Sequence, residues 1–175
     1  MKTIIIDTET TGLDCNNDEL LQVSIIADDE EVLYDSYFKP ERVTSWDEAQ
    51  AVNHISPEFV ERFPNISDEI EEINKILLGA DCVIGYNTFF DVDFLRAAGA
   101  TFRDDIEYID VMTLFAPVFG ERDPKYDGDF KWQSLETCAE YYGYNWKKRP
   151  QQAHNSLADC FATLFCYNMI TKTLF

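Results

Sequence analysis

Three strand-like segments open the chain before any helical pattern begins, and this order limits the possible folds more than any other feature of the sequence. Ile4–Ile6 is a β-branched run, typical of a strand that is buried on both faces. Leu20–Ala27 and Glu31–Phe38 follow it, and a short acidic turn joins these two segments. Successive strands with short links pair as antiparallel neighbours. The sequence therefore predicts a sheet that begins with three antiparallel strands.

Helices and strands alternate in the remaining residues. The predicted helices are Trp46–Ile55, Ser67–Leu78, Phe89–Ala98, Val111–Phe119, Ser134–Tyr142 and Ser156–Thr171, the predicted strands are Cys82–Tyr86 and Ile106–Ile109, and Gly120–Lys131 is a predicted loop. Strands that alternate with helices join a sheet in parallel. At 175 residues the chain fits one domain. We predict a single α/β domain over residues 1–175, in which a mixed sheet, first antiparallel and then parallel, carries helices on its faces.

The chain is strongly acidic, with 14 basic and 33 acidic side chains and a net charge of −19. Such a charge argues against binding to anionic membranes and against proteins that clamp long duplexes through many phosphates. It does not exclude a nucleic-acid enzyme whose carboxylates hold cations. The whole excess lies in residues 1–120, and residues 121–175 are neutral. A polyanion would therefore meet the least repulsion over the last third of the chain.

The cysteines are odd in number and scattered, without a CxxC pair. They are Cys15, Cys82, Cys138, Cys160 and Cys166. This usage predicts reduced thiols in a cytoplasmic protein rather than a disulfide framework or a zinc site. The apolar run at the start is too short for a signal peptide, and no run is long enough to span a membrane, so we expect no membrane partner.

Two carboxylates follow the first apolar run. Asp7 and Glu9 are two positions apart, so both side chains point to the same side of a strand. The alternative interpretation is a polar strand end that leads into the Thr8–Gly12 turn. In that turn Gly12 permits a tight bend, in which backbone N–H groups can meet a ligand.

Asp91 closes the segment Asn87–Asp91, in the first turn of the predicted helix Phe89–Ala98. Thr88 and Asp91 have the spacing of a capping box, so a helix cap is one interpretation of both residues. By itself Asp91 would support no other role.

His154 and Asp159 are five residues apart, which places them about 140° apart around an ideal helix. They can reach one site only if His154 lies on the loop before the helix. Asn155 and Ser156 are suitable N-caps, which would place Asp159 in the first turn. A lone loop histidine would otherwise be an exposed side chain.

Taken together, the segments Asp7–Asp14, Asn87–Asp91 and His154–Asp159 resemble the three motifs of the DEDDh family of 3′-to-5′ exonucleases, which includes the proofreading epsilon subunit of bacterial DNA polymerase III. Tyr108–Asp110 and Ser134–Leu135 continue the resemblance, which runs over nearly the whole chain. It implies an RNase H-like fold and a metal-dependent enzyme that releases nucleoside 5′-monophosphates from 3′ ends of single-stranded nucleic acid. The opening motif is most similar to the proofreading branch, which favours DNA.

The resemblance also implies the roles of single residues. The implied catalytic residues are His154, Asp7, Glu9, Asp91 and Asp159, of which the four carboxylates would hold two divalent cations, Mg²⁺ or Mn²⁺. The implied substrate-binding residues are Thr10, Thr11, Gly12, Leu13, Asn87 and Phe90. Four carboxylates in one cleft repel each other unless cations are bound, and hard oxygen ligands suit these ions. His154 would take a proton from the attacking water.

Other assignments stay open at this point. An RNA-trimming enzyme and a non-catalytic polymerase accessory subunit are the alternative functions, and a DNA polymerase is a candidate partner. Few residues follow the last predicted helix, so we expect no long tail that tethers a polymerase. Where the family has a His-Gly dipeptide this chain has Asn53-His54, so a helix-cap or surface role competes with a substrate role for His54. The cationic segment Lys147–Arg149 is either a solvated loop or a phosphate contact.

Overall fold

β1 (Thr3–Thr10) is the central strand of a five-stranded mixed sheet in the computed structural model, which describes residues 2–123, 130–148 and 154–174. The other strands are β2 (Leu20–Ala27), β3 (Val32–Tyr37), β4 (Cys82–Gly85) and β5 (Glu107–Asp110). Their order is β3-β2-β1-β4-β5, with β1, β2 and β3 antiparallel and β1, β4 and β5 parallel. The predicted antiparallel meander and the parallel addition to it are both present.

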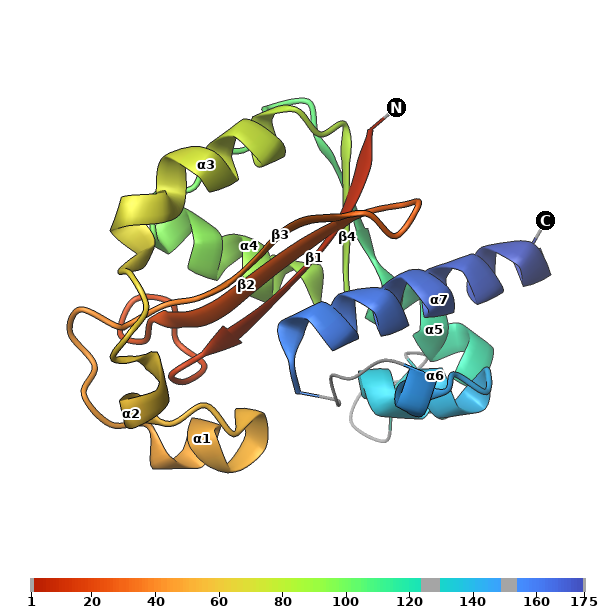
Figure 1. Ribbon diagram of the computed structural model, residues 1–175. Helices are drawn as coiled ribbons and strands as arrows, with labels where there is room; N and C mark the ends of the chain where they lie inside the picture. The colour runs from red at the N-terminus through yellow and green to blue at the C-terminus, as the bar shows by residue number, and fades with distance from the viewer. Residues whose placement is uncertain (1, 124–129, 149–153, 175) are drawn as a thin grey trace.

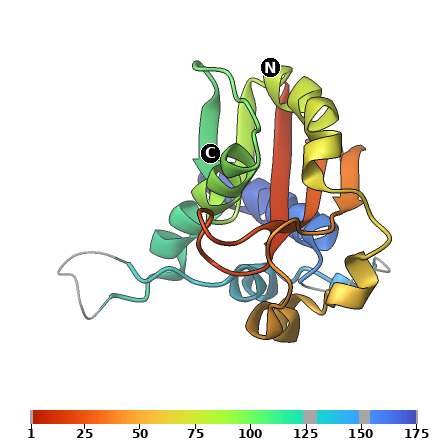
Figure 2. The same cartoon turned by 90° about the vertical axis from the view of Figure 1, so that its left-hand side faces the viewer.

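Helices cover both faces of this sheet (Figure 1). They are α1 (Asp47–Asn53), α2 (Pro57–Val60), α3 (Ile66–Leu78), α4 (Thr88–Ala97), α5 (Val111–Phe119), α6 (Leu135–Tyr141) and α7 (Ser156–Leu174), with the 3₁₀ helix η1 (Trp146–Lys148). Figure 2 shows α3 and α4 on the near face and α7 on the far face. In the same view α1 and α6 lie at the end of the sheet where β1 ends.

Alternation along β1 divides its apolar side chains between two buried layers. Ile4 and Ile6 pack with residues of α3 and α4, whereas Ile5 packs with residues of α5, α6 and α7. A strand that is buried on both faces has to be apolar at consecutive positions, which is why this run contains no polar residue. Positions Asp7 and Glu9 continue the side of Ile5 and therefore face α7.

β1 is longer than the predicted strand because its polar end still has a partner. It pairs with β2 up to Thr10, but with β4 only up to Ile5. The last five residues of β1 therefore have a strand neighbour on one side only. This overhang leaves room at the end of the sheet for side chains from the helices.

The remaining differences are local. α2 was not predicted, because a four-residue helix has no periodicity; Ser56 caps it with its side chain, and Pro57 begins it. The indole N–H of Trp46, just before α1, donates to the carbonyl oxygen of Ile55, just after it, at 2.7 Å, so this hydrogen bond joins the two ends of the helical segment. Asp110 caps α5 by accepting a hydrogen bond from the Met112 amide. Within the predicted loop Gly120–Lys131, residues 124–129 lie outside the described residues.

The cysteine and membrane predictions also meet observations here. All five cysteines are free thiols in the structure. Among the helices of residues 2–123, 130–148 and 154–174, none is long and apolar enough to cross a membrane.

Candidate active site

Three of the four predicted carboxylates meet where the overhang of β1 passes under the start of α7. Oxygen atoms of Asp7, Glu9 and Asp159 lie within 4.8 Å of one another. Asp7 and Glu9 are on the face of β1 that α7 covers, and Asp159 is in the first turn of α7. Side chains two positions apart on a strand share one face, which brings Asp7 and Glu9 together. Because α7 begins over that face, Asp159 in its first turn joins them.

Asp91 reaches the same region from the opposite face of the sheet. It is 3% exposed and lies in the first turn of α4. Its Oδ1 accepts hydrogen bonds from the Thr8 amide at 2.9 Å and from the Thr8 hydroxyl at 2.8 Å. The Thr8 amide belongs to the part of β1 that has no β4 neighbour, so the carboxylate takes the place of a missing strand.

The capping-box interpretation of Thr88 and Asp91 is wrong. α4 begins after Asn87, which has a left-handed backbone with φ of 64° and makes no side-chain cap. The Thr88 hydroxyl donates to the Ile109 carbonyl oxygen at 2.7 Å. The Asn87 amide donates to Asp110 at 2.9 Å. The Asp91 carboxylate and the Thr88 hydroxyl, which a capping box would bond to the first turn of α4, instead bond to β1 and β5.

Burial raises the pKa values of all four carboxyl groups, and repulsion within the cluster adds to the rise for Asp7 and Glu9. The pKa of Asp7 is raised well above its usual range, first by burial and then by Asp91, Asp159 and Glu9. Burial, with Asp159 and Asp91, raises the pKa of Glu9 to about 8. Burial also raises the pKa values of Asp91 and Asp159 to about 7. An acidic cluster that resists ionisation at neutral pH is one that a cation would stabilise.

The donor set fits a hard divalent cation. Oδ2 of Asp159 accepts a hydrogen bond from the His154 amide at 3.2 Å, but Oδ1 is buried and has no hydrogen-bond partner among the described residues. A buried carboxylate oxygen without a partner is costly. It lies among other carboxylate oxygens, the ligands that Mg²⁺ and Mn²⁺ prefer. The residues present therefore fit the predicted cofactor class.

His154 precedes α7, as the five-residue spacing requires. It has a left-handed backbone with φ of 63°, and Nε2 of its ring lies 3.3 Å from Oε1 of Glu136 in α6. Asp159 and His154 thus belong to one turn, joined by the backbone bond described above. The neighbouring carboxylate of Glu136 could not be found from the sequence, because nothing in the α6 segment distinguishes it from a solvent-exposed helix residue.

The turn after β1 is held by its own side chains. Asp18 accepts a hydrogen bond from the Asp14 amide at 3.0 Å and one from the Thr11 hydroxyl at 3.3 Å. A Cβ at Gly12 would overlap with the Asp18 carboxylate. A larger residue would force the Asp18 side chain away from its hydrogen bonds with Thr11 and Asp14, whereas Gly12 has no positive φ, so the bend itself does not require glycine.

A cavity of about 900 Å³ lies beside the carboxylates, between this turn and α1. Five of the predicted substrate residues line it: Thr10, Thr11, Gly12, Leu13 and Phe90. Leu13 is 86% exposed, so an apolar side chain stands open at the rim. Asn87, the sixth, is exposed and is not among the residues that line this cavity.

Asn53 is a lining residue that the sequence did not single out. Its side-chain N–H donates to the Thr10 carbonyl oxygen at 3.2 Å, and its hydrogen bond to Glu9 opposes the rise of that pKa. The sequence feature that could have pointed to Asn53 was the replacement of the family's His-Gly dipeptide by Asn53-His54. His54 itself is exposed and ends α1 with a backbone φ of 60°, and its backbone amide donates to the Gln50 carbonyl oxygen, so the residue is the C-cap of the helix.

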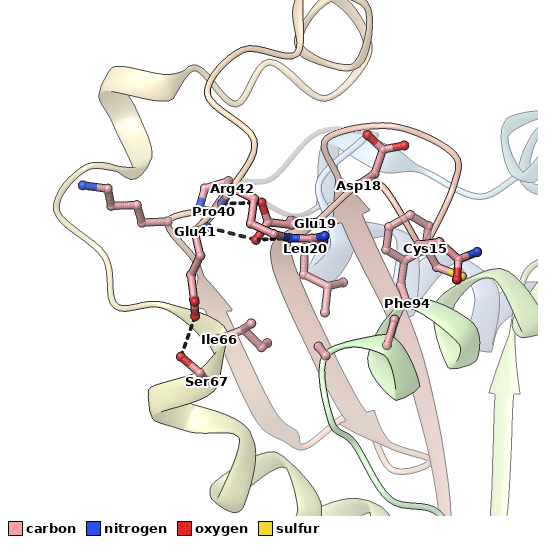
Figure 3. Close-up of a pocket in the computed structure, with 14 residues that line it drawn as sticks. Cys15, Asp18, Glu19, Leu20, Pro40, Glu41, Arg42, Ile66, Ser67 and Phe94 are labelled. Carbon is pink, nitrogen blue, oxygen red and sulfur yellow. Dashed lines mark hydrogen bonds and ion pairs between the residues drawn. The ribbon is translucent and has the colours of Figure 1, made fainter.

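A second cavity, of about 470 Å³, contains none of the predicted site residues. Figure 3 shows it between the β1–β2 loop, the segment after β3, and helices α3 and α4. Glu19 accepts hydrogen bonds there from the amides of Glu41, Arg42 and Val43, at 3.0, 2.8 and 2.6 Å. These hydrogen bonds connect the end of the β1–β2 loop to the segment after β3.

The raised pKa values predict how the metal-free protein responds to pH. Between about pH 4 and about pH 8 the folded state keeps protons on these carboxyl groups that the unfolded state has lost, so the free energy of unfolding falls as pH rises. We expect the melting temperature in EDTA to decrease over this range, and saturating Mg²⁺ to remove most of the decrease. An equal decrease with and without Mg²⁺ would contradict the metal site.

Comparisons with known proteins point to one group of enzymes. A family model named RNase_T and described as "Exonuclease" matches residues 4–167. The DNA polymerase III subunit epsilon of Treponema pallidum (strain Nichols) is 26% identical over 94 residues, which make up 52% of this chain and 43% of that protein. The match thus spans less than half of that relative.

Two solved structures share the fold over nearly the whole chain. Exonuclease X in complex with 5′-overhanging duplex DNA is 23% identical with a TM-score of 0.69, covering 98% of this chain and 92% of that one. The zinc-bound E. coli exonuclease I complex with single-stranded DNA is 19% identical with a TM-score of 0.77, covering 98% of this chain and 40% of that one. These likenesses confirm the predicted RNase H-like α/β fold.

Proposed function

Because the chain belongs to the RNase_T family of exonucleases, we propose that it is a metal-dependent enzyme that hydrolyses phosphodiester bonds at the 3′ end of single-stranded DNA and releases nucleoside 5′-monophosphates. One observation carries this proposal: oxygen atoms of Asp7, Glu9 and Asp159 lie within 4.8 Å of one another. Asp91 and His154 lie beside them, so the residues of all three motifs gather at one end of the sheet. We further propose that residues 1–175 act as one exonuclease domain.

The carboxylates are proposed to hold two divalent cations, Mg²⁺ or Mn²⁺. Asp7, Glu9 and Asp159 supply the clustered oxygens, and Asp91 has Oδ2 left, because Thr8 occupies its Oδ1. When bound, two such ions offset four negative charges and stabilise the attacking and leaving oxygens of an in-line displacement. Without them the cluster would repel a phosphodiester.

His154 is proposed to take the proton from the attacking water. Its position outside α7 leaves the ring free of the helix, while its backbone amide stays bonded to Asp159. Imidazole is the side chain best suited to accept a proton near neutral pH. The hydrogen bond to Asp159 keeps this group next to the carboxylates.

The cavity between the β1 turn and α1 is proposed to take the terminal nucleotide. Its volume of about 900 Å³ is in the range of small-molecule sites. Leu13 at the rim and Phe90 inside offer apolar surface to a base. Asn53 fixes the wall next to Glu9.

DNA is proposed as the substrate rather than RNA because the epsilon relative is a subunit of a DNA polymerase and both structural neighbours described above hold DNA. The same relative makes a DNA polymerase the candidate partner. The five free thiols support a cytoplasmic location. Cleavage of RNA is the alternative that the following experiment separates.

Oligonucleotides labelled at either end test the proposal directly, with DNA and RNA in parallel and with Mg²⁺ or EDTA. We expect a 3′ label to leave first as a mononucleotide and a 5′ label to remain on a ladder of shortening products. EDTA should stop both reactions. Internal cuts, release of a 5′ label first, or cleavage without metal would contradict the proposal, and faster loss of RNA would reverse the substrate assignment.

The salt dependence of binding should be shallow, because a chain of net charge −19 can neutralise few phosphates. Two or three contacts, at about −0.7 each, give a slope of about −1.4 to −2 for log affinity against log salt concentration. Lys147 in η1 is a candidate contact, and the side chain of Lys148 and the whole of Arg149 lie outside what the structure describes. Fluorescence anisotropy with Ca²⁺ in place of Mg²⁺ measures this slope. A slope several times steeper would mean that the protein contacts more phosphates through basic side chains than the two or three assumed here.

A further inference from the structure

Two rows of polar side chains cross the face of the sheet that α7 covers. The first row is Glu9, Gln22 and Tyr37, and the second is Asp7, Ser24 and Asp35, each in the order β1, β2, β3. Each row starts at a carboxylate of the candidate site and ends on the edge strand. Gln22 and Ser24 interrupt a strand that is otherwise apolar, and both are buried.

Both polar atoms of the Gln22 amide have partners. Gln22 is 1% exposed, and its Nε2 donates to Asp35 Oδ1 at 2.9 Å. Its Oε1 accepts hydrogen bonds from Asn155 Nδ2 at 3.1 Å and from the Ser156 amide at 3.3 Å. A buried amide is costly unless satisfied in this way, so the contact fixes the partners as well as Gln22.

The other members of the rows hold the same short segment. Ser24 and Ser156 share a hydrogen bond of 2.6 Å between their hydroxyls. Asn155 also donates to the Tyr37 hydroxyl at 2.8 Å. The two residues at the start of α7 are therefore bonded to both β2 and β3.

This attachment matters because the rest of α7 rests on the sheet mainly through apolar contacts, with weak hydrogen bonds from the Cys160 thiol to the Ile5 and Ser24 carbonyl oxygens at 3.7 and 3.4 Å. Leu157, Cys160, Phe161 and Leu164 pack against Ile5, Ile26 and neighbouring residues. Hydrophobic contacts are not directional, so they stabilise the packing without setting where the helix begins. Directional hydrogen bonds at its start can set that position.

We propose that Gln22 is a positioning residue for the exonuclease reaction: it holds Asn155 and Ser156 on the sheet, so that His154 and Asp159 on either side of them face Asp7 and Glu9. The proposal rests on the proposed function. It assigns no contact between Gln22 and the substrate. Loss of the attachment should therefore lower kcat and leave KM for the oligonucleotide near its wild-type value.

Gln22→Leu removes the hydrogen bonds and keeps the size. We expect kcat at saturating Mg²⁺ to fall about 10- to 100-fold, the effect of a small misplacement of catalytic groups. Gln22→Glu keeps an acceptor for Asn155 and Ser156 but sets a carboxylate against Asp35, so kcat should fall as well. Gln22→Glu combined with Asp35→Asn reverses the donor and the acceptor of that pair, and kcat should return to within a few fold of wild type.

Asn65→Ala is the matched control, because it removes a side-chain amide that donates to the Lys39 carbonyl oxygen at 2.8 Å. Asn65 directly precedes α3, which packs on the opposite face of the sheet from α7. It should lower stability without changing kcat. A Gln22→Leu enzyme with wild-type kcat, or a double variant no faster than Gln22→Glu, would overturn the proposal. Because the comparison of Gln22→Glu with the double variant needs no third protein, it decides the matter even if Gln22→Leu fails to fold.

A failure of the proposed function would look different. In that case the wild type itself degrades no oligonucleotide, and the positions of the site residues are read from Mn²⁺ affinity by calorimetry. Gln22→Glu should then bind Mn²⁺ more weakly than wild type, and the double variant should recover the affinity. Equal Mn²⁺ affinity in the three proteins would overturn the positioning role separately from the reaction.

Discussion

Replacing Asp7 with alanine is expected to abolish nuclease activity while the metal-free protein stays folded and at least as stable as the wild type near neutral pH. Asp7 belongs to the cluster whose oxygens lie within 4.8 Å of one another, and burial raises its pKa, with added repulsion from Asp91, Asp159 and Glu9. Its removal therefore deletes a proposed metal ligand and relieves an unfavourable charge at the same time.

The measurement pairs degradation of a labelled oligonucleotide with urea unfolding in EDTA. Asp68→Ala is the control, because Asp68 is an exposed carboxylate in the first turn of α3. It should keep full activity. Wild-type cleavage by Asp7→Ala would remove the proposed site altogether, and a large loss of stability would mean that Asp7 has a structural role instead.

The second large effect separates the proposed base from the proposed ligands. His154→Ala should lower kcat about 10²- to 10⁴-fold, the usual contribution of general-base catalysis. Its metal affinity should stay near wild type, because the bond to Asp159 comes from the backbone amide at position 154, which alanine keeps. Asp159→Asn should lose both rate and metal binding. Activity assays at saturating Mg²⁺ and calorimetry with Mn²⁺ measure the two quantities.

Two control variants separate the loss of the His154 imidazole from backbone strain and from the loss of a histidine elsewhere. His154 has φ of 63°, and asparagine tolerates that backbone better than alanine does, so His154→Asn tests whether strain alone lowers the rate. His54→Gly changes the other histidine, at a position whose φ of 60° suits glycine, and should keep the wild-type rate. If His154→Ala weakened Mn²⁺ binding as much as Asp159→Asn does, the division of roles would be wrong.

Local sequence patterns were enough for most of the fold and for part of the site. The β-branched run and the order of segments predicted the mixed sheet, because strand and helix periods are properties of neighbouring residues. The spacing of two residues placed Asp7 and Glu9 on one side of β1, and that of five placed His154 ahead of α7. The catalytic roles of these residues stay predictions.

Other features depend on which segments meet, and no local pattern contains that information. Thr88 and Asp91 had the spacing of a helix cap, but Asp91 bonds to Thr8, 83 residues away, because β4 stops short and leaves the Thr8 amide without a strand partner. Glu136 beside His154 and Asn53 beside Glu9 have the same origin in tertiary packing.

Gln22 shows the division most clearly. By itself, the sequence determined a strand at Leu20–Ala27 and left a glutamine in it that the strand pattern does not account for. Only the tertiary structure decided its partners, which lie in β3 and, 133 residues away, at the start of α7. The physical reason is that a buried amide must find hydrogen bonds wherever the packed chain supplies them, whereas an apolar side chain needs only to be covered.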